Sequence, residues 1–186
     1  VRETDPFETP ADESLAFSSP YEARITLMWK EMREQILPLI DKSERKIDDV
    51  KGYMSSLDVK YKDDAYHSLS IEGYKISAEL IEKVRSGNWK PDAEDKENKN
   101  ALVARGYYLA FQAVKESVKE VLEGADAGMV VKKNHQQWYL QMWSPFVGVG
   151  LLKASDFIGY RNNQVYIRGS LHTPLSPDNV RVAMPV

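Results

Sequence analysis

The side chains that most often carry catalysis are few in this sequence, and none of them forms a recognisable site. Its three histidines are His67, His135 and His172, and none has a second histidine at the spacing of a metal site. The 186 residues include no cysteine, so disulfides and zinc–thiolate sites are excluded. They also include no nucleophile elbow, Walker loop or dinucleotide-binding glycine motif, and Gly148-Val149-Gly150 is interpreted as a plain turn. Spacing alone therefore identifies no catalytic residue and no metal ligand.

One hydroxyl and one carboxylate are predicted to share a helix face. Ser68 and Glu72 are four residues apart within the segment 62–72, which has the pattern of a short helix. Gly73 follows at once and can take the left-handed conformation with which many helices end. Taken by itself, Glu72 is interpreted as a surface acid beside a helix-ending glycine.

The only strong β signal lies near residues 158–168. Gly159-Tyr160-Arg161 and Gln164-Val165-Tyr166-Ile167 predict two short strands. Asn162-Asn163 lies between them, and asparagine tolerates the positive φ angles that a tight turn requires. We therefore expect one β-hairpin, which can be purely structural, with alternate side chains packing on the core and facing water.

Most of the remaining chain has helical periodicity. The first helix is predicted from near Tyr21 until Pro38 kinks or ends it. A helix over 78–85 is predicted to be capped by Ser77 and closed by Gly87, and one over about 97–122 to end at Gly124. Further helices are predicted over 132–143, with a stop at Pro145, and over 151–157. Small residues on the longest one should let a neighbouring helix approach closely: Ala101, Ala104, Gly106 and Ala110. A last helix starts at Ser176-Pro177-Asp178, and unless Pro185 ends it we expect the natural protein to continue past Val186.

The bulk composition is that of a soluble globular protein. Hydrophobic residues make up 42% and charged residues 28%, and the net charge of -3 gives no reason to expect nucleic-acid binding. No apolar run approaches the roughly 20 residues of a membrane helix. We expect a cytoplasmic protein that does not bind membranes.

Two stretches, taken together, resemble the Fic (filamentation induced by cAMP) family. Ser68-Leu69-Ser70-Ile71-Glu72-Gly73 is similar to the family's inhibitory motif, Ser or Thr, three residues, Glu, then Gly or Asn. The segment from Gly159 to Pro177 resembles the flap hairpin and the helix entry behind it, although Leu175 and Ser176 separate prolines that are adjacent in many relatives. The helix that opens with Asn100 and Ala104 also resembles a core helix of the family. The resemblance covers roughly residues 64–186, and the catalytic sequence His-x-Phe-x-Asp/Glu-Gly-Asn-Gly-Arg does not occur in the chain.

The resemblance implies a mainly α fold, a Fic-like helical bundle with one β-hairpin flap, truncated before the catalytic helix-loop-helix. Residues 1–20, rich in Pro, Ser, Thr and acids, are predicted to be an extended arm. With the resemblance, the rest of the chain divides into an N-terminal helical region with the inhibitory helix over 21–92 and the first part of the core over 93–186, with the flap near 158–168.

The resemblance also implies a function, the transfer of AMP from ATP, with Mg²⁺, to a hydroxyl of a target protein. Glu72 would pair with an arginine of the missing motif that otherwise holds the γ-phosphate of ATP, and Ser68 would steady the same helix. Gln164, Val165, Tyr166 and Ile167 would dock the target by main-chain hydrogen bonds. This chain by itself is then inactive and binds no nucleotide tightly.

Two alternative functions stay open at this point. The chain could be a non-catalytic helical interaction module built on the same scaffold. It could belong to a relative that transfers another nucleotide or phosphocholine. A homodimer is compatible with any of these interpretations.

Overall fold

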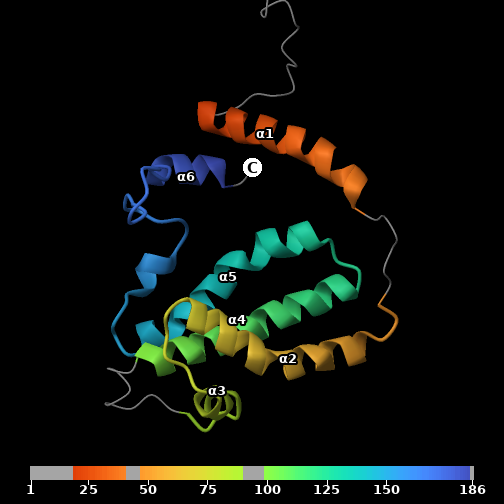
Figure 1. Ribbon diagram of the computed structural model, residues 1–186, viewed down its shortest axis with the longest axis vertical. Coiled ribbons are helices and arrows are strands. Elements are labelled where there is room, and N and C mark those ends of the chain that lie inside the picture. Colours follow the sequence, from red (N-terminus) through yellow and green to blue (C-terminus); the bar gives the residue numbers. More distant parts are fainter. Residues whose placement is uncertain (1–18, 41–46, 90–98, 185–186) are drawn as a thin grey trace, which may run out of the picture. The chain divides into compact units, whose positions relative to one another are not determined.

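The computed structural model describes residues 19–40, 47–89 and 99–184, and within these ranges the chain is mainly α-helical with no β-strand. Figure 1 shows the helices in chain order. They are α1 (Pro20–Ile36), α2 (Val50–Ile71), α3 (Ala78–Arg85), α4 (Lys99–Leu122), α5 (Ala127–Gly148) and α6 (Pro177–Ala183), with short 3₁₀ helices η1 (Leu37–Leu39) and η3 (Ala154–Phe157). Most of the predicted arm over 1–20 and the predicted start of the long helix at 97–98 lie outside the described residues.

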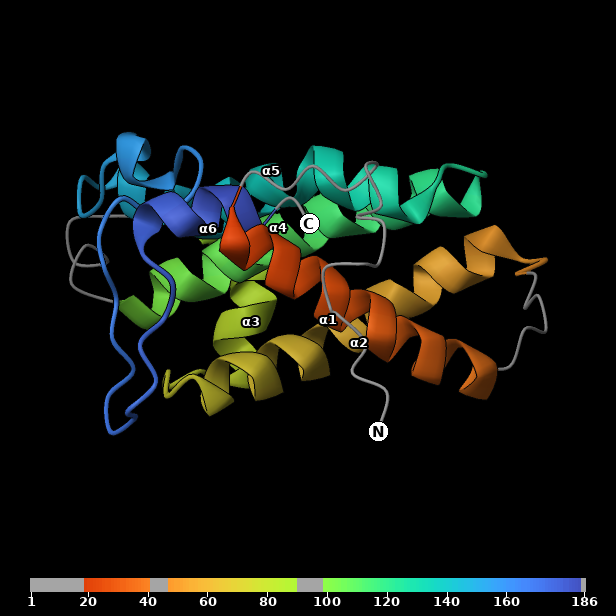
Figure 2. The ribbon, with the colours of Figure 1, turned by 90° about the horizontal axis from the view of Figure 1, so that it is seen from above.

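The chain divides into two compact units, which are described separately. Of the described residues, 47–89 and 99–159 belong to one unit, and 19–40 and 160–184 to the other. In the first unit α4 is the central helix, because it contacts α2, α3 and α5. Figure 2 shows α4 and α5 running beside each other along their length. At the crossing Gly106 of α4 faces the backbone of α5 at Met142, so the predicted close approach of a neighbouring helix is confirmed at this residue.

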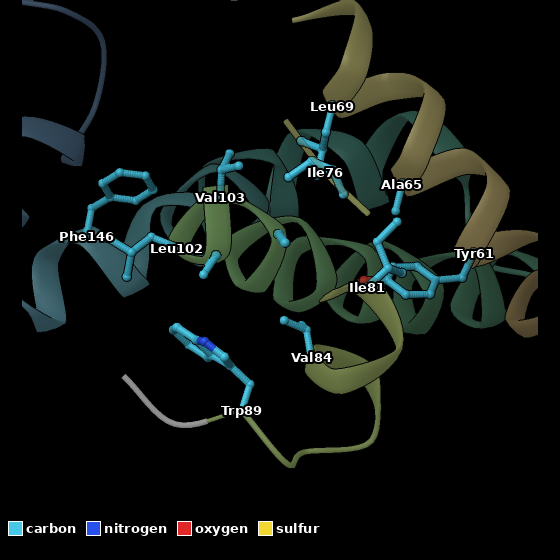
Figure 3. Packing of buried hydrophobic residues seen from close by; sticks show 12 residues of the cluster. Tyr61, Ala65, Leu69, Ile76, Ile81, Val84, Trp89, Leu102, Val103 and Phe146 are labelled. Carbon is cyan, nitrogen blue, oxygen red and sulfur yellow. The ribbon is translucent and has the colours of Figure 1, made fainter. Parts of the chain in front are cut away.

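The core of this unit forms where α2, α3 and the N-terminal half of α4 meet. Ile81, Val84, Leu102 and Val103 have no measurable exposed surface, and Tyr61 is 2% exposed. Figure 3 shows these side chains converging, with Leu69 and Ile76 next to each other at one side of the cluster. Burying an aliphatic side chain of this kind contributes about 1.5–3 kcal/mol. The segment between Leu69 and Ile76 is therefore fixed at both ends.

Capping residues define the helix boundaries, and the cap at Ser77 was predicted from the sequence whereas the one at Asp126 was not. Ser77 accepts a hydrogen bond from the Leu80 amide at the start of α3, and Asp126 accepts one from the Met129 amide at the start of α5. Gly87 and Gly124 follow α3 and α4 with φ of +74° and +105°, a conformation that glycine adopts without steric cost. The predicted helix ends at these two glycines are confirmed.

Two helices are longer than predicted. Helix α2 is continuous from Val50, and α5 extends from Ala127 to Gly148 with Pro145 inside its last turn. The predicted stop at Pro145 is wrong. Pro145 has no amide hydrogen to donate to the Gln141 carbonyl, four residues before it. The Ser144 hydroxyl donates to that carbonyl instead, at 3.0 Å, so the carbonyl keeps a partner and the helix continues for one more turn.

The second unit contains α1, η1, α6 and the segment before α6. Helix α1 begins at Pro20 behind its cap, Ser19, which accepts a hydrogen bond from the Glu22 amide, and it ends at Ile36, just before Pro38, as predicted. Helix α6 begins at Pro177 behind the predicted cap, Ser176, whose side chain accepts a hydrogen bond from the Asn179 amide. Helix α6 contacts α1. Across the described ranges, no helix is both long enough and apolar enough to cross a lipid bilayer.

Candidate functional site

Glu72 lies at the exposed C-terminal end of α2, where a Schellman turn closes the helix. The Gly73 amide donates to the Ser70 carbonyl and the Tyr74 amide to the Leu69 carbonyl, both at 3.0 Å. This turn needs a left-handed residue, and Gly73 supplies it with φ of +85°. Ser68 lies one helical turn before Glu72 in α2. The structure therefore puts the predicted Ser68, Glu72 and Gly73 on one helix end, in the order and geometry that the spacing indicated.

The backbone that carries Glu72 is anchored by buried side chains on both sides. Leu69, three residues before it, is 3% exposed, and Ile76, four residues after it, is 8% exposed. Polar contacts with α4 add to these anchors. The Lys75 amide donates to the Asn100 side-chain oxygen at 3.1 Å, which fixes the chain just after the turn.

Tyr107 of α4 holds the other side of the turn. Its hydroxyl lies 2.6 Å from the Asp64 carboxylate and 3.3 Å from the Ser68 hydroxyl, both on α2. Partial burial, together with the hydrogen bond to Asp64, raises the pKa of Tyr107 to about 12. Tyr107 therefore stays protonated near neutral pH and keeps its donor.

The Glu72 carboxylate is exposed and has no hydrogen-bond or ion-pair partner within the described ranges. Asp58 differs, since it accepts two hydrogen bonds from the Lys115 ammonium group, at 2.6 and 2.7 Å. An unpaired carboxylate on a fixed backbone can accept a bidentate arginine without a large ordering cost.

The hollows near α2 are lined by other residues. One, of about 490 Å³, is bordered by Lys60, Asp63, Asp64 and His67 of α2 and by Phe111 of α4. A second, also of about 490 Å³, lies between Lys62 and helix α3. Glu72 lines neither of them. No group of three or more metal-ligating side chains occurs in the described part of the chain.

The predicted hairpin at 158–168 is absent as a pair of strands. Asn162 and Asn163 do not take positive φ, and the turn lies further along the chain, where the Ser170 amide donates to the Ile167 carbonyl at 3.1 Å and Gly169 has φ of +77°. The physical reason is that the left-handed conformation costs little for glycine and more for asparagine. The prediction of strands joined by an asparagine turn is therefore corrected to an irregular loop with a glycine turn.

Side chains, not a strand ladder, close this loop. The Arg161 guanidinium donates to the Leu175 carbonyl, and the Gln164 amide donates to the Pro174 carbonyl at 2.8 Å. Val165, Tyr166 and Ile167 are 43%, 77% and 52% exposed. The main-chain amides of Gln164 to Ile167 donate to none of the residues that the structure describes. The predicted docking residues therefore form an open, partly apolar edge.

A scan of protein-family models, a search of curated proteins and a search of solved structures each returned no match to this chain. Any functional assignment therefore depends on the residues and their geometry. Sequence reasoning missed the roles of Tyr107 and Asp64. Two signals were available: Asp64 and Ser68 are four residues apart on one face of α2, and Asn100 and Tyr107 are seven apart on one face of α4.

Proposed function

We propose that this chain is the regulatory front portion of a Fic-type protein adenylyltransferase, in which Glu72 is an inhibitory carboxylate. The observation that supports this proposal is the unpaired Glu72 side chain on a turn fixed by Leu69, Ile76 and contacts with α4. In this proposal the helices of residues 45–159 are the first part of a Fic-like bundle. In this proposal the catalytic histidine motif is supplied from outside these 186 residues, which do not contain it, so the 186 residues alone would be inactive.

The proposed inhibition is a competition for one arginine of that motif. In the active state the arginine binds the γ-phosphate of ATP, which arrives with Mg²⁺. In the inhibited state the Glu72 carboxylate occupies the same guanidinium group by a bidentate pair. A charge-assisted hydrogen bond contributes about 1.5–3 kcal/mol, so removing Glu72 should raise the transfer rate about tenfold to a hundredfold.

The loop 160–176 would dock the target protein. The free main-chain amides of Gln164 to Ile167 can pair with an extended target segment, and the exposed side chains of Val165 and Tyr166 can add apolar contact. Such pairing fixes the position of a target hydroxyl without a strict sequence requirement. The loop need not be a hairpin before the target binds, because the added strand supplies the missing hydrogen-bond partners.

The experiment needs the motif-bearing protein, by which we mean a polypeptide that carries these 186 residues and the histidine motif together. Glu72→Gly and Glu72→Gln variants should both incorporate more AMP from radiolabelled ATP than the unchanged protein. Asp63→Asn is the matched control, since Asp63 is an exposed acid on the same helix with no partner in the described residues.

Two results would count against the proposal. If the downstream coding sequence encodes no histidine motif, the alternative of a non-catalytic interaction module is favoured. If the motif is present but the two Glu72 variants transfer AMP at the rate of the Asp63→Asn control, Glu72 is not inhibitory. Transfer of a different phosphate-containing group, with the same Glu72 dependence, would change the donor but keep the regulatory role.

A further inference from the structure

Two polar side chains on one face of α4 hold the Glu72 turn. Asn100 and Tyr107 are seven residues apart, which is about two helical turns, so they project from the same side of the helix. The Asn100 side chain accepts a hydrogen bond from the Lys75 amide, which follows the turn in the chain. The Tyr107 hydroxyl contacts Asp64 and Ser68, which precede the turn. The exposed carboxylate of Glu72 lies between these two attachments along the chain.

The protons in the Tyr107 contact can be assigned. A phenol has one hydrogen, and the ionised Asp64 can only accept, so Tyr107 donates to Asp64 across 2.6 Å. The Ser68 hydroxyl, 3.3 Å away, must then donate to the Tyr107 oxygen. The result is a chain of donors from Ser68 through Tyr107 to Asp64. It fixes the last two turns of α2 against α4.

We infer that Tyr107 is a positioning residue that sets the strength of inhibition by Glu72, acting through Ser68 and Asp64 and not by touching nucleotide. This inference rests on the proposed function of Glu72. When the Tyr107 hydroxyl is lost, α2 keeps its buried Leu69 but loses two contacts: the charge-assisted one at Asp64, about two turns before Glu72, and the one at Ser68, one turn before it. The carboxylate then samples more orientations and meets its arginine less often.

The first test uses the 186-residue chain and needs no activity. Tyr107→Phe removes one oxygen atom and keeps the ring. Tyr108→Phe is the matched control, because Tyr108 is the adjacent tyrosine and its hydroxyl has no hydrogen bond within the described ranges. Amide hydrogen exchange at Gly73 and Tyr74 should become about tenfold faster in Tyr107→Phe and stay unchanged in Tyr108→Phe.

An internal reference is available in the same chain. The end of α4 has the same turn, with the Ala125 amide donating to the Glu120 carbonyl and the Gly124 amide to the Val121 carbonyl. Exchange at Ala125 should not change in either variant. Equal exchange at Tyr74 in the two variants would overturn the inference, and so would a general increase that includes Ala125.

The second test is AMP transfer by the motif-bearing protein. Tyr107→Phe should raise the rate severalfold, and Asp64→Asn, which keeps an acceptor but not the charge, should raise it less. Adding Tyr107→Phe to Glu72→Gly should change nothing further, because a residue that acts only through Glu72 has no effect once Glu72 is gone.

The outcomes separate the two ideas. If Glu72→Gly raises the rate and Tyr107→Phe does not, the inference is wrong and the inhibitory role of Glu72 stands. If Tyr107→Phe still raises the rate in the Glu72→Gly background, Tyr107 acts by another route and the inference is wrong. If Glu72→Gly itself has no effect, both the proposed function and the inference that rests on it fail.

Discussion

Gly106 is the residue at which an added methyl group should do the most damage. A Cβ at this position in α4 would lie 1.8 Å from the Met142 carbonyl oxygen and 2.8 Å from its carbonyl carbon, both in the backbone of α5. The two helices would have to separate by roughly 1.5 Å to restore an ordinary contact, in an interior packed as densely as a crystal. Overpacking costs about 1–3 kcal/mol, and the upper end applies because a backbone carbonyl cannot rotate away.

The intrinsic helix preference acts in the opposite direction. Alanine is better than glycine in a helix by about 1 kcal/mol, so the net effect of Gly106→Ala should be a loss of about 2 kcal/mol. Gly148→Ala is the matched control: Gly148 ends α5 and a Cβ there meets nothing within 4 Å, so this change should be neutral or stabilising. Urea unfolding followed by helical circular dichroism measures both. A Gly106→Ala variant as stable as the original chain would refute the close helix contact.

The remaining predictions concern a buried hydroxyl and a helix cap. The Tyr61 hydroxyl is buried and has no hydrogen-bond partner in the described part of the chain, and burial raises its pKa. Because the hydroxyl makes no bond that could be lost, Tyr61→Phe should change the free energy of unfolding by less than about 0.5 kcal/mol or increase it. A loss above about 1 kcal/mol in the same urea titration would mean that the hydroxyl has a partner. Asp126 caps α5 by accepting a hydrogen bond from the Met129 amide at 2.8 Å, so Asp126→Ala should lower the free energy of unfolding by about 1 kcal/mol. The control Asp63→Ala, on the exposed face of α2, should lower it by less than about 0.5 kcal/mol. Equal losses in these last two variants would show that the cap contributes nothing.

Helix boundaries could be predicted where a local rule decides them. Ser77, Ser176 and Gly73 act through groups within a few residues, so their capping roles follow from the sequence and are confirmed. Pro145 was misjudged because the rule that proline ends a helix neglects a neighbour that bonds the freed carbonyl, here Ser144. The small residues of α4 predicted that a neighbouring helix approaches closely, as α5 does at Gly106, but they did not predict which helix it would be.

The candidate site was only half predictable. Ser68, Glu72 and Gly73 form a local unit, and the sequence indicated their shared helix end. Tyr107 lies 43 residues from Asp64 in the chain, and nothing local pairs them; only the packing of α2 on α4 brings the two together. The loop 160–176 failed as a hairpin prediction for the same kind of reason, since its closing bonds come from Arg161 and Gln164 side chains to distant carbonyls.

In the proposed function, the Glu72 carboxylate and the γ-phosphate of ATP compete for one arginine. The most direct test is to measure the dissociation constants of ATP and ADP for the motif-bearing protein, with and without Glu72→Gln. Glu72→Gln should lower the dissociation constant of ATP about tenfold, which corresponds to about 1.4 kcal/mol of binding free energy. The dissociation constant of ADP should stay unchanged, because ADP has no γ-phosphate. Unchanged affinity for ATP, or an equal gain for both nucleotides, would contradict the proposed competition.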